Sequence, residues 1–408
     1  MRPERLEKSL ERQIRAFHWI RLQAELSGRF AGTDQEGEAG RRVESWLREL
    51  GLDEVAFASV PSRPRPGWVW AVHLGLAALG CAVGGIAGAV LAAFAALSFQ
   101  REASGGAPLL TRGWPARDSQ NVVGRVGSTR PRRRVVLTAH LDAAQASRLF
   151  AGRLVDRFVS PRPGGRPPRG VSALPMRLLG AAALVTAASA LGADGAIVAT
   201  ARAFVGAALV VVAVAAARWA RASGSAGAND NASGVAAMLS AVEQLAAQLP
   251  PDVELWCAAT GAGQTGSRGM HALLEAHPEW RTDSTAFVNF SCVGGGALHY
   301  VRSEGALSRT PYPPSLIELA RRVAAGASYG PVSPADLAID TGGQVAAQRG
   351  GHVLSLIALE ANGLPRGFRA HGDLPEQLDT ETVIRAADFG CCVVSAYLRG
   401  DAEPVAYV

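Results

Sequence analysis

Residues 260–270 form a glycine-rich loop whose spacing could serve an anion or a nucleotide. Gly261, Gly263 and Gly266 make a GxGxxG pattern between a predicted strand and a predicted helix. Backbone N–H groups at the start of a helix can hold a pyrophosphate. A dinucleotide site would also need an acidic residue at the end of the next strand, where Ser291 stands. The pattern therefore lacks one element of a dinucleotide site. The alternative hypothesis is that the loop binds a simple anion.

Four further motifs follow one another along the polar sequence. They are Ser-Gly-Arg-Phe-Ala-Gly-Thr at 27–33, Leu-Thr-Ala-His-Leu-Asp at 137–142, Gly-Ala-Asn-Asp-Asn-Ala-Ser-Gly at 227–234 and His-Gly-Asp at 371–373. Together with the loop at 260–270, their order and spacing resemble the zinc aminopeptidase family (M28-type peptidases), which includes the glutaminyl cyclases. The resemblance implies an α/β fold with a mixed sheet sandwiched by helices.

The resemblance also implies roles for single residues in a two-zinc site. In the family, histidines and carboxylates hold the two ions and a glutamate acts as general base. His140 corresponds to the first histidine, Asp230 to the bridging aspartate and His371 to the last ligand. Asp142 corresponds to the group that orients the first histidine. Outside this motif context, the two histidines would be read as hydrogen-bonded core residues.

Three positions depart from the family pattern. Gly263 stands where the general base belongs, Gln264 where a glutamate ligand belongs and Ser291 where an aspartate ligand belongs. One carboxylate of three remains, and buried charge without compensation is costly. We therefore expect no intact catalytic residue. Zinc is expected at one ion at most, held by His140, Asp230 and His371, or not at all.

Two long apolar stretches interrupt the polar sequence. Residues 68–100 contain no Asp, Glu, Lys or Arg. In residues 178–217 the charged residues are Asp194 and Arg202 alone. A bilayer core of about 30 Å needs about 20 apolar residues per helix. We predict two inserted transmembrane hairpins, within residues 67–100 and 173–221. For the first stretch, one long tilted crossing stays open as an alternative.

Small residues mark the first of these stretches. Gly80, Gly84 and Gly88 recur at four-residue spacing, which allows two helices to approach closely. The other reading is a permissive turn near Gly84 and Gly85. The second stretch should turn near residues 192–195.

Charge and domain order favour a domain on the cytoplasmic side of a membrane. The net charge is +6. Many arginines flank the apolar stretches: Arg63, Arg65, Arg101, Arg162, Arg166, Arg169, Arg177, Arg218 and Arg221. Such flanks are typically cytoplasmic. Residues 1–66, 101–172 (with a basic Pro/Gly-rich loop) and 222–408 should then complete one peptidase-like domain. Five cysteines without CxxC spacing favour a reducing compartment.

Periodicity supports alternating strands and helices in the polar blocks. Strands are predicted at 55–60, 121–126, 134–140, 253–259, 286–291 and 353–359, and helices at 235–249, 267–276 and 380–398. This alternation is typical of an α/β sheet with helices on its faces.

Two functions from different classes follow. The first is a membrane-anchored pseudopeptidase that binds or scaffolds, as the resemblance implies for relatives such as nicastrin and the transferrin receptor, which also lack ligands. The alternative is an active aminopeptidase-type hydrolase that uses one zinc. The expected partners are membrane lipid and an unidentified protein or peptide. No motif of a nucleic-acid-binding module occurs, so nucleic acid is not expected.

Overall fold

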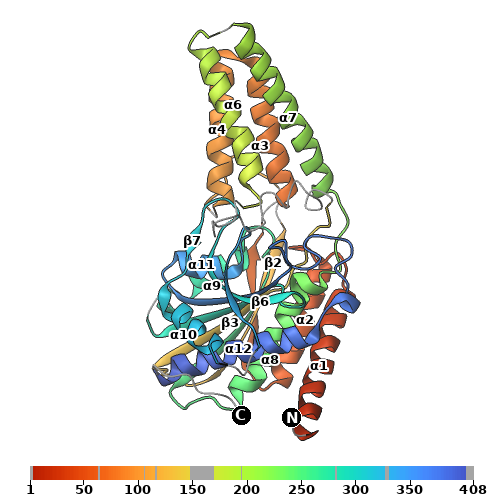
Figure 1. The fold of residues 1–408 in the computed structure, drawn as a ribbon, viewed down its shortest axis with the longest axis vertical. Helices are drawn as coiled ribbons and strands as arrows, with labels where there is room; N and C mark the ends of the chain where they lie inside the picture. The colour runs from red at the N-terminus through yellow and green to blue at the C-terminus, as the bar shows by residue number, and fades with distance from the viewer. Residues whose placement is uncertain are drawn as a thin grey trace.

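A computed structural model describes residues 3–62, 65–104, 106–114, 117–147, 170–193, 195–280, 283–326 and 330–400. The chain forms an α/β part and a bundle of apolar helices that stands on it (Figure 1). Most of the Pro/Gly-rich loop lies outside the described residues.

A mixed sheet of nine strands, counted over the described residues, runs through the α/β part. The strands are β1 (Asp53–Pro61), β2 (Asp118–Gly127), β3 (Arg133–His140), β4 (Val253–Thr260), β5 (Thr285–Phe290), β6 (Ala297–Glu304), β7 (Thr310–Pro311), β8 (Ser333–Asp336) and β9 (His352–Leu359). Their order is β1-β2-β4-β3-β5-β9-β6-β7, with β8 paired to β6. The central strands β4, β3, β5 and β9 are parallel, whereas β2 and β6 flank them antiparallel.

Helices cover both faces of the sheet. They are α1 (Pro3–Ala24), α2 (Asp34–Glu49), α8 (Gly234–Ala246), α9 (Arg268–Ala276), α10 (Pro314–Ala324), α11 (Gly342–Gln348) and α12 (Thr380–Arg399). Val135 and Leu137 of β3 pack with α1, α2, α8, α10 and α12, whereas Val136 packs with α9 and α11. This alternation follows from the two-residue period of a strand. The predicted α/β fold with helices on both faces is confirmed.

The predicted strands and helices are present, with ends shifted by a few residues. The sequence did not indicate β6, α10 or α11. β6 mixes buried and exposed positions without strict alternation, and α11 is only seven residues long. Such short or mixed segments carry little periodic signal.

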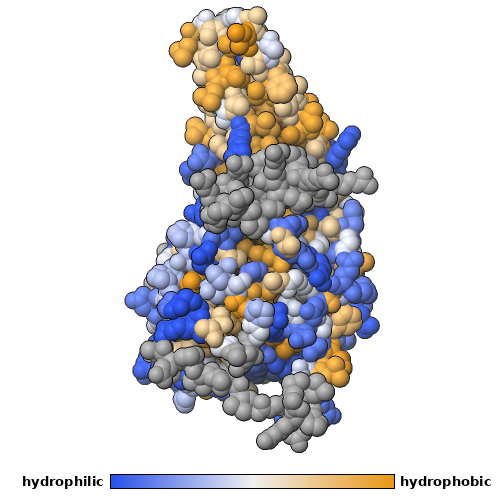
Figure 2. All heavy atoms as spheres, in the orientation of Figure 1, coloured by the Kyte–Doolittle hydropathy of each residue, from blue (hydrophilic) through white to orange (hydrophobic). Residues whose placement is uncertain are grey.

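Four apolar helices form the bundle, and among the described residues they are the helices long and apolar enough to cross a membrane. They are α3 (Pro66–Val83), α4 (Gly85–Ala103), α6 (Ala173–Ala190) and α7 (Ala196–Ala220). Figure 2 shows apolar residues on the outside of the bundle. Ile86, Leu184, Ile197 and Phe204 are 74–86% exposed. The bundle therefore shows an apolar surface where a water-soluble helix bundle would be polar.

Glycines set the packing of the first hairpin. The chain turns at Gly84, with φ of 67°, so α3 and α4 are a hairpin and not one long helix. Gly80 and Gly88 face each other: a Cβ on Gly80 would lie 2.7 Å from the carbonyl oxygen of Gly88. Arg202 of α7 donates to the carbonyl oxygen of Cys81 (3.1 Å) and to Ser189 of α6 (2.9 Å), which ties the two hairpins together.

The glycine contact predicts a loss of stability on Gly80→Ala. The added methyl group meets Gly88 and should lower the free energy of unfolding by about 1–3 kcal/mol, as overpacking typically does. Gly75→Ala on the same helix is the control, because a Cβ there meets nothing within 4 Å. Thermal unfolding in detergent measures both variants. Equal melting temperatures for Gly80→Ala and Gly75→Ala would contradict the close contact.

Candidate functional site

A cavity of about 170 Å³ lies at the carboxyl ends of the central strands, next to the apolar bundle. The positions singled out by the family pattern line it: His140, Asp230, Gly263, Gln264 and Ser291. Their elements explain the convergence. β3 ends at His140, β5 ends one residue before Ser291, and the loop after β4 carries Gly263 and Gln264. Parallel strands bring their carboxyl ends to one edge, where ligands bind in open α/β sheets.

His140 lies between two carboxylates. Its Nδ1 is 3.3 Å from Asp142 Oδ1 and its Nε2 is 3.4 Å from Asp230 Oδ1. Burial lowers the pKa of His140, but the hydrogen bonds and charges of Asp142 and Asp230 outweigh it and raise the pKa to about 10. The structure thus brings together the predicted pair His140 and Asp230, with Asp142 in contact with the imidazole.

Asp230 is almost fully buried, at 3% exposure. Its Oδ1 accepts a hydrogen bond from Gln264 Nε2 at 2.9 Å. Its Oδ2 is buried and has no hydrogen-bond partner among the described residues. Burial raises the pKa of Asp230, but the hydrogen bond and charge of His140 and the charge of Arg369 bring it below its ordinary value. Asp230 therefore faces two basic side chains and one amide.

Arg369 is the cavity residue that sequence reasoning missed. It lines the cavity, and its Nη2 donates to Gln264 Oε1 at 3.4 Å. Its guanidinium carbon lies 5.1 Å from the ring centroid of Trp219. An electrostatic argument could have predicted such a residue. A buried Asp230 without metal ions needs another positive charge nearby.

His371 does not join this group, because its side chain is exposed. The neighbouring Asp373 instead accepts hydrogen bonds from the backbone N–H groups of Asn229 (2.6 Å) and Asp230 (3.0 Å). The His-Gly-Asp motif therefore holds the Asp230 loop in place through its aspartate. The ligand set His140, Asp230 and His371 is not assembled in this structure.

The residues at the cavity do not fit a zinc pair. Within the described ranges, no three His, Cys, Asp or Glu side chains are arranged to hold a metal ion. Gln264 donates an N–H group to Asp230 Oδ1. A zinc site would need an electron-pair donor at this position, not a hydrogen-bond donor. Ser291 is buried and its Oγ is 3.8 Å from Cys292 Sγ. Asp230 Oδ2 is a buried acceptor at the cavity without a hydrogen-bond partner among the described residues.

Backbone N–H groups of the glycine-rich loop donate to side chains of the chain itself. Gly263 and Gln264 donate their backbone N–H groups to Asp142, at 2.7 and 2.8 Å. The N–H groups of Gly261 and Ala262 are also engaged, with Asn121 Oδ1 (3.0 Å) and Glu36 Oε1 (3.2 Å). The four consecutive backbone donors at residues 261–264 are thus engaged by side chains of this chain, and the anion loop at Gly261, Gly263 and Gly266 stays a prediction.

Gly263 has no room for a side chain. A Cβ at this position would lie 2.5 Å from His140 Cβ, 2.7 Å from His140 Cγ and 2.9 Å from Asp142 Oδ1. Distances under about 3.0 Å require the neighbour to move, and His140 Cβ is fixed to the end of a central strand. The place of the family's general base is thus closed by the imidazole.

A buried polar network lies beside the cavity. Tyr312 and Thr341 donate to Glu304 Oε1, the latter at 3.0 Å. Thr341 also accepts from Asn289, and both of these residues line the cavity. Glu304 Oε2 is buried without a hydrogen-bond partner in the described chain. Burial raises the pKa of Glu304 to about 8, so this carboxyl is largely neutral near pH 7.

The fold is that of solved zinc aminopeptidases. The zinc aminopeptidase of Bacillus subtilis has a TM-score of 0.54 at 14% identity, over 94% of this chain and 94% of that one. The LapA aminopeptidase of Legionella pneumophila has a TM-score of 0.54 at 9% identity, over 99% of this chain and 76% of that one. The glutaminyl cyclase of Tannerella forsythia has a TM-score of 0.51 at 14% identity, over 94% and 97%.

The family is indicated by the second half of the sequence. Residues 211–388 match the model of peptidase family M28. The expected resemblance to the zinc aminopeptidases is confirmed at this level. Among curated proteins, no sequence matches this chain.

The crowding at Gly263 predicts that Gly263→Ala is destabilising. We expect the free energy of unfolding to fall by about 1–3 kcal/mol, because His140 or the loop must move. Gly113→Ala is the control, since a Cβ there meets nothing within 4 Å, and it should change stability by no more than about 0.5 kcal/mol. Denaturant unfolding measures both. A neutral Gly263→Ala would show that the site has space for a side chain.

The raised pKa of Glu304 predicts a pH-dependent stability difference. As the pH rises from the ordinary pKa of 4.5 toward 8, the unfolded chain loses the Glu304 proton before the folded chain does. The wild type therefore loses stability through this window relative to Glu304→Gln, by roughly 3–5 kcal/mol at about 1.4 kcal/mol per pKa unit. Unfolding measured below, within and above the window checks this. A difference that stays constant with pH would contradict a buried neutral carboxyl.

Proposed function

We propose that this protein is a membrane-anchored member of the peptidase family that binds a ligand without hydrolysing it, a pseudopeptidase. The observation that carries the proposal is Gly263: the residue at the general-base position has no side chain, and His140 fills the space beside it. A positioned base contributes about 10²–10⁴-fold to such reactions. The substitutions Gln264 and Ser291 remove two ligand positions as well, which leaves a cavity suited to binding.

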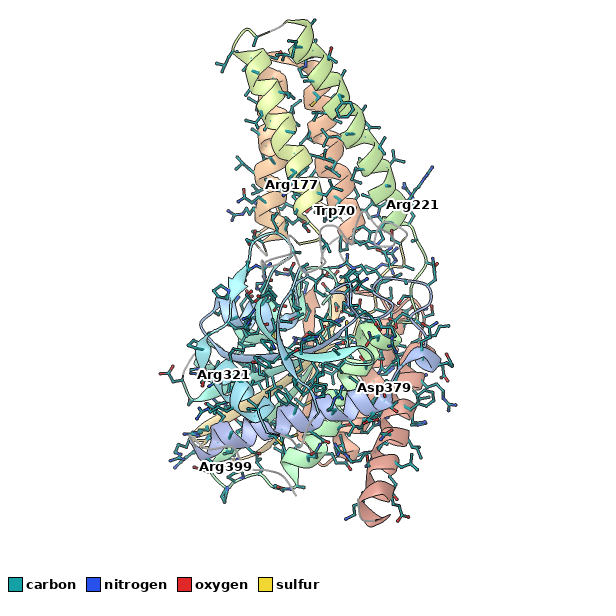
Figure 3. All side chains as sticks on the ribbon, in the orientation of Figure 1. Trp70, Arg177, Arg221, Arg321, Asp379 and Arg399 are labelled. Carbon is teal, nitrogen blue, oxygen red and sulfur yellow. The ribbon has the colours of Figure 1, made fainter. Side chains whose placement is uncertain are left out.

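Membrane anchoring is proposed from the four apolar helices and their arginines. The outward apolar side chains of the bundle suit lipid, and each hairpin returns to the α/β part (Figure 1). Arg177 and Arg221 lie near the end of the bundle that meets the α/β part, as does Trp70 (Figure 3). Positive charge at this end favours the cytoplasmic side for the α/β part.

A second function is favoured by one observation. Asp230 Oδ2 is a buried acceptor without a partner among the described residues, and His140 lies beside the other oxygen of the same carboxylate. A rearranged site with one zinc, in which His371 turns inward, would make the chain an aminopeptidase-type hydrolase. The missing base at Gly263 argues against this alternative.

Zinc content separates the two functions. We expect the full chain, purified in detergent and supplied with zinc, to retain far less than one zinc per chain in elemental analysis, with no difference between the wild type and His140→Ala. The same samples should not release amino acids from a panel of aminoacyl fluorogenic substrates. An active zinc aminopeptidase treated in parallel is the positive control. Stoichiometric zinc that is lost in His140→Ala, together with turnover, would establish the hydrolase instead.

A further inference from the structure

The apolar bundle itself forms one wall of the cavity. Pro66, Val69 and Trp70 come from the first turns of α3, Phe99 and Glu102 from the last turns of α4, and Trp219 from the end of α7; all line the cavity. The opposite wall carries the polar groups at the carboxyl ends of the strands. The cavity therefore joins the inserted helices to the site described above.

Aromatic side chains make this wall continuous. Trp70 packs edge-on against Phe99 with ring centroids 6.4 Å apart, and against Trp219 with centroids 5.8 Å apart. The guanidinium carbon of Arg369 lies 5.1 Å from the ring centroid of Trp219. Tryptophan is enriched where a membrane helix meets the headgroup region. The wall thus has the composition of a membrane interface but faces a cavity.

The polar end of the cavity offers carboxylate oxygens. Asp230 Oδ2 is buried without a hydrogen-bond partner among the described residues. Asp340 lines the same cavity, where its Oδ1 accepts a hydrogen bond from the N–H group of Ala306 at 2.6 Å. Its carboxylate also has a hydrogen bond with the side chain of Gln344. An ammonium group is a donor that suits both carboxylates. Arg369 supplies a positive charge in the same cavity.

We propose that the cavity binds the headgroup of an aminophospholipid, a membrane lipid with a primary ammonium group next to a phosphodiester. This inference rests on the proposed binding function and names its ligand class. The ammonium group binds at Asp230 and Asp340, Arg369 compensates the phosphodiester, and the glycerol and acyl portion lies along Trp70 and Phe99 toward the bilayer.

The size of the cavity favours a lipid headgroup over a peptide. Its volume of about 170 Å³ is below the about 300–1,000 Å³ of pockets that enclose a whole drug-sized ligand. It can hold one end of an amphiphile while the rest stays outside. Because the wall on that side consists of α3, α4 and α7, the remainder of the ligand lies along helices that we place in the bilayer.

The test uses the full chain, delipidated in detergent, and native mass spectrometry with short-chain probes. Dihexanoyl phosphatidylethanolamine should bind. Dihexanoyl phosphatidylcholine should bind at least tenfold more weakly, because its trimethylammonium group donates no hydrogen bond. Free O-phosphoethanolamine and inorganic phosphate should bind more weakly than the ethanolamine lipid, since neither contacts the aromatic wall.

Two pairs of variants locate the site. Asp340→Asn should weaken binding of the ethanolamine lipid about tenfold, whereas Asp336→Asn, outside the cavity, should not change it. Trp70→Ala should weaken binding of the lipid but not of free O-phosphoethanolamine. Trp68→Ala is its control, because Trp68 lies on the same helix and contacts Trp114 and Arg221 instead. If Trp70→Ala does not fold, the comparison of Asp340→Asn with Asp336→Asn still tests whether the cavity binds the lipid.

Several outcomes would overturn the proposal. They are equal binding of the choline and ethanolamine lipids, binding that Asp340→Asn leaves unchanged, binding of inorganic phosphate as tight as that of the lipid, or binding of a membrane-tethered peptide with no lipid binding. The substrate panel with zinc is read separately. Absent lipid binding without turnover overturns this inference alone, whereas turnover overturns the proposed function alone.

Discussion

The buried carboxylate of Asp230 is the constraint on which the arrangement around the cavity depends. An ionised carboxylate in the protein interior requires hydrogen bonds and positive charge. In this chain His140 and Gln264 both contact Oδ1, and Arg369 adds a second positive charge. Side chains thus supply the compensation that metal ions supply in a two-zinc site. Gln264, which the resemblance places at a ligand position, is here a hydrogen-bond donor to Asp230.

Asp142 links this charge arrangement to the backbone. Its carboxylate contacts His140 and also accepts the N–H groups of Gly263 and Gln264. The loop after β4 is therefore held directly against the imidazole, which is why no Cβ fits at Gly263. The close approach of the loop to His140 therefore requires glycine at position 263. A side chain at position 263 would require the loop, Asp142 and His140 to move together.

Sequence reasoning succeeded where the signal was local. The buried parallel strands and both hairpin turns follow from apolar runs and glycine positions, and the proximity of His140, Asp142 and Asp230 follows from motif order. It failed where the information was three-dimensional. The exposure of His371 and the place of Arg369 depend on the path of the loop after β9. The occupied N–H groups of Gly261 and Gly263 depend on Glu36, Asn121 and Asp142, which are distant in sequence. Short or edge elements such as β6 and α11 lacked a periodic pattern.

The positions of the two insertions explain why the cavity has an apolar wall. One hairpin lies between β1 and β2, and the other between β3 and the loop of Asp230. The second therefore leaves the sheet at its carboxyl edge, where the cavity lies, and contacts between α3 and α7 and between α4 and α6 bring the first to the same place. If the bundle lies in a membrane, as we propose, this topology couples membrane attachment to ligand access. In that arrangement a ligand that enters from the aqueous side would pass beside the helix ends, whereas an amphiphile in the bilayer would already lie against α3 and α4.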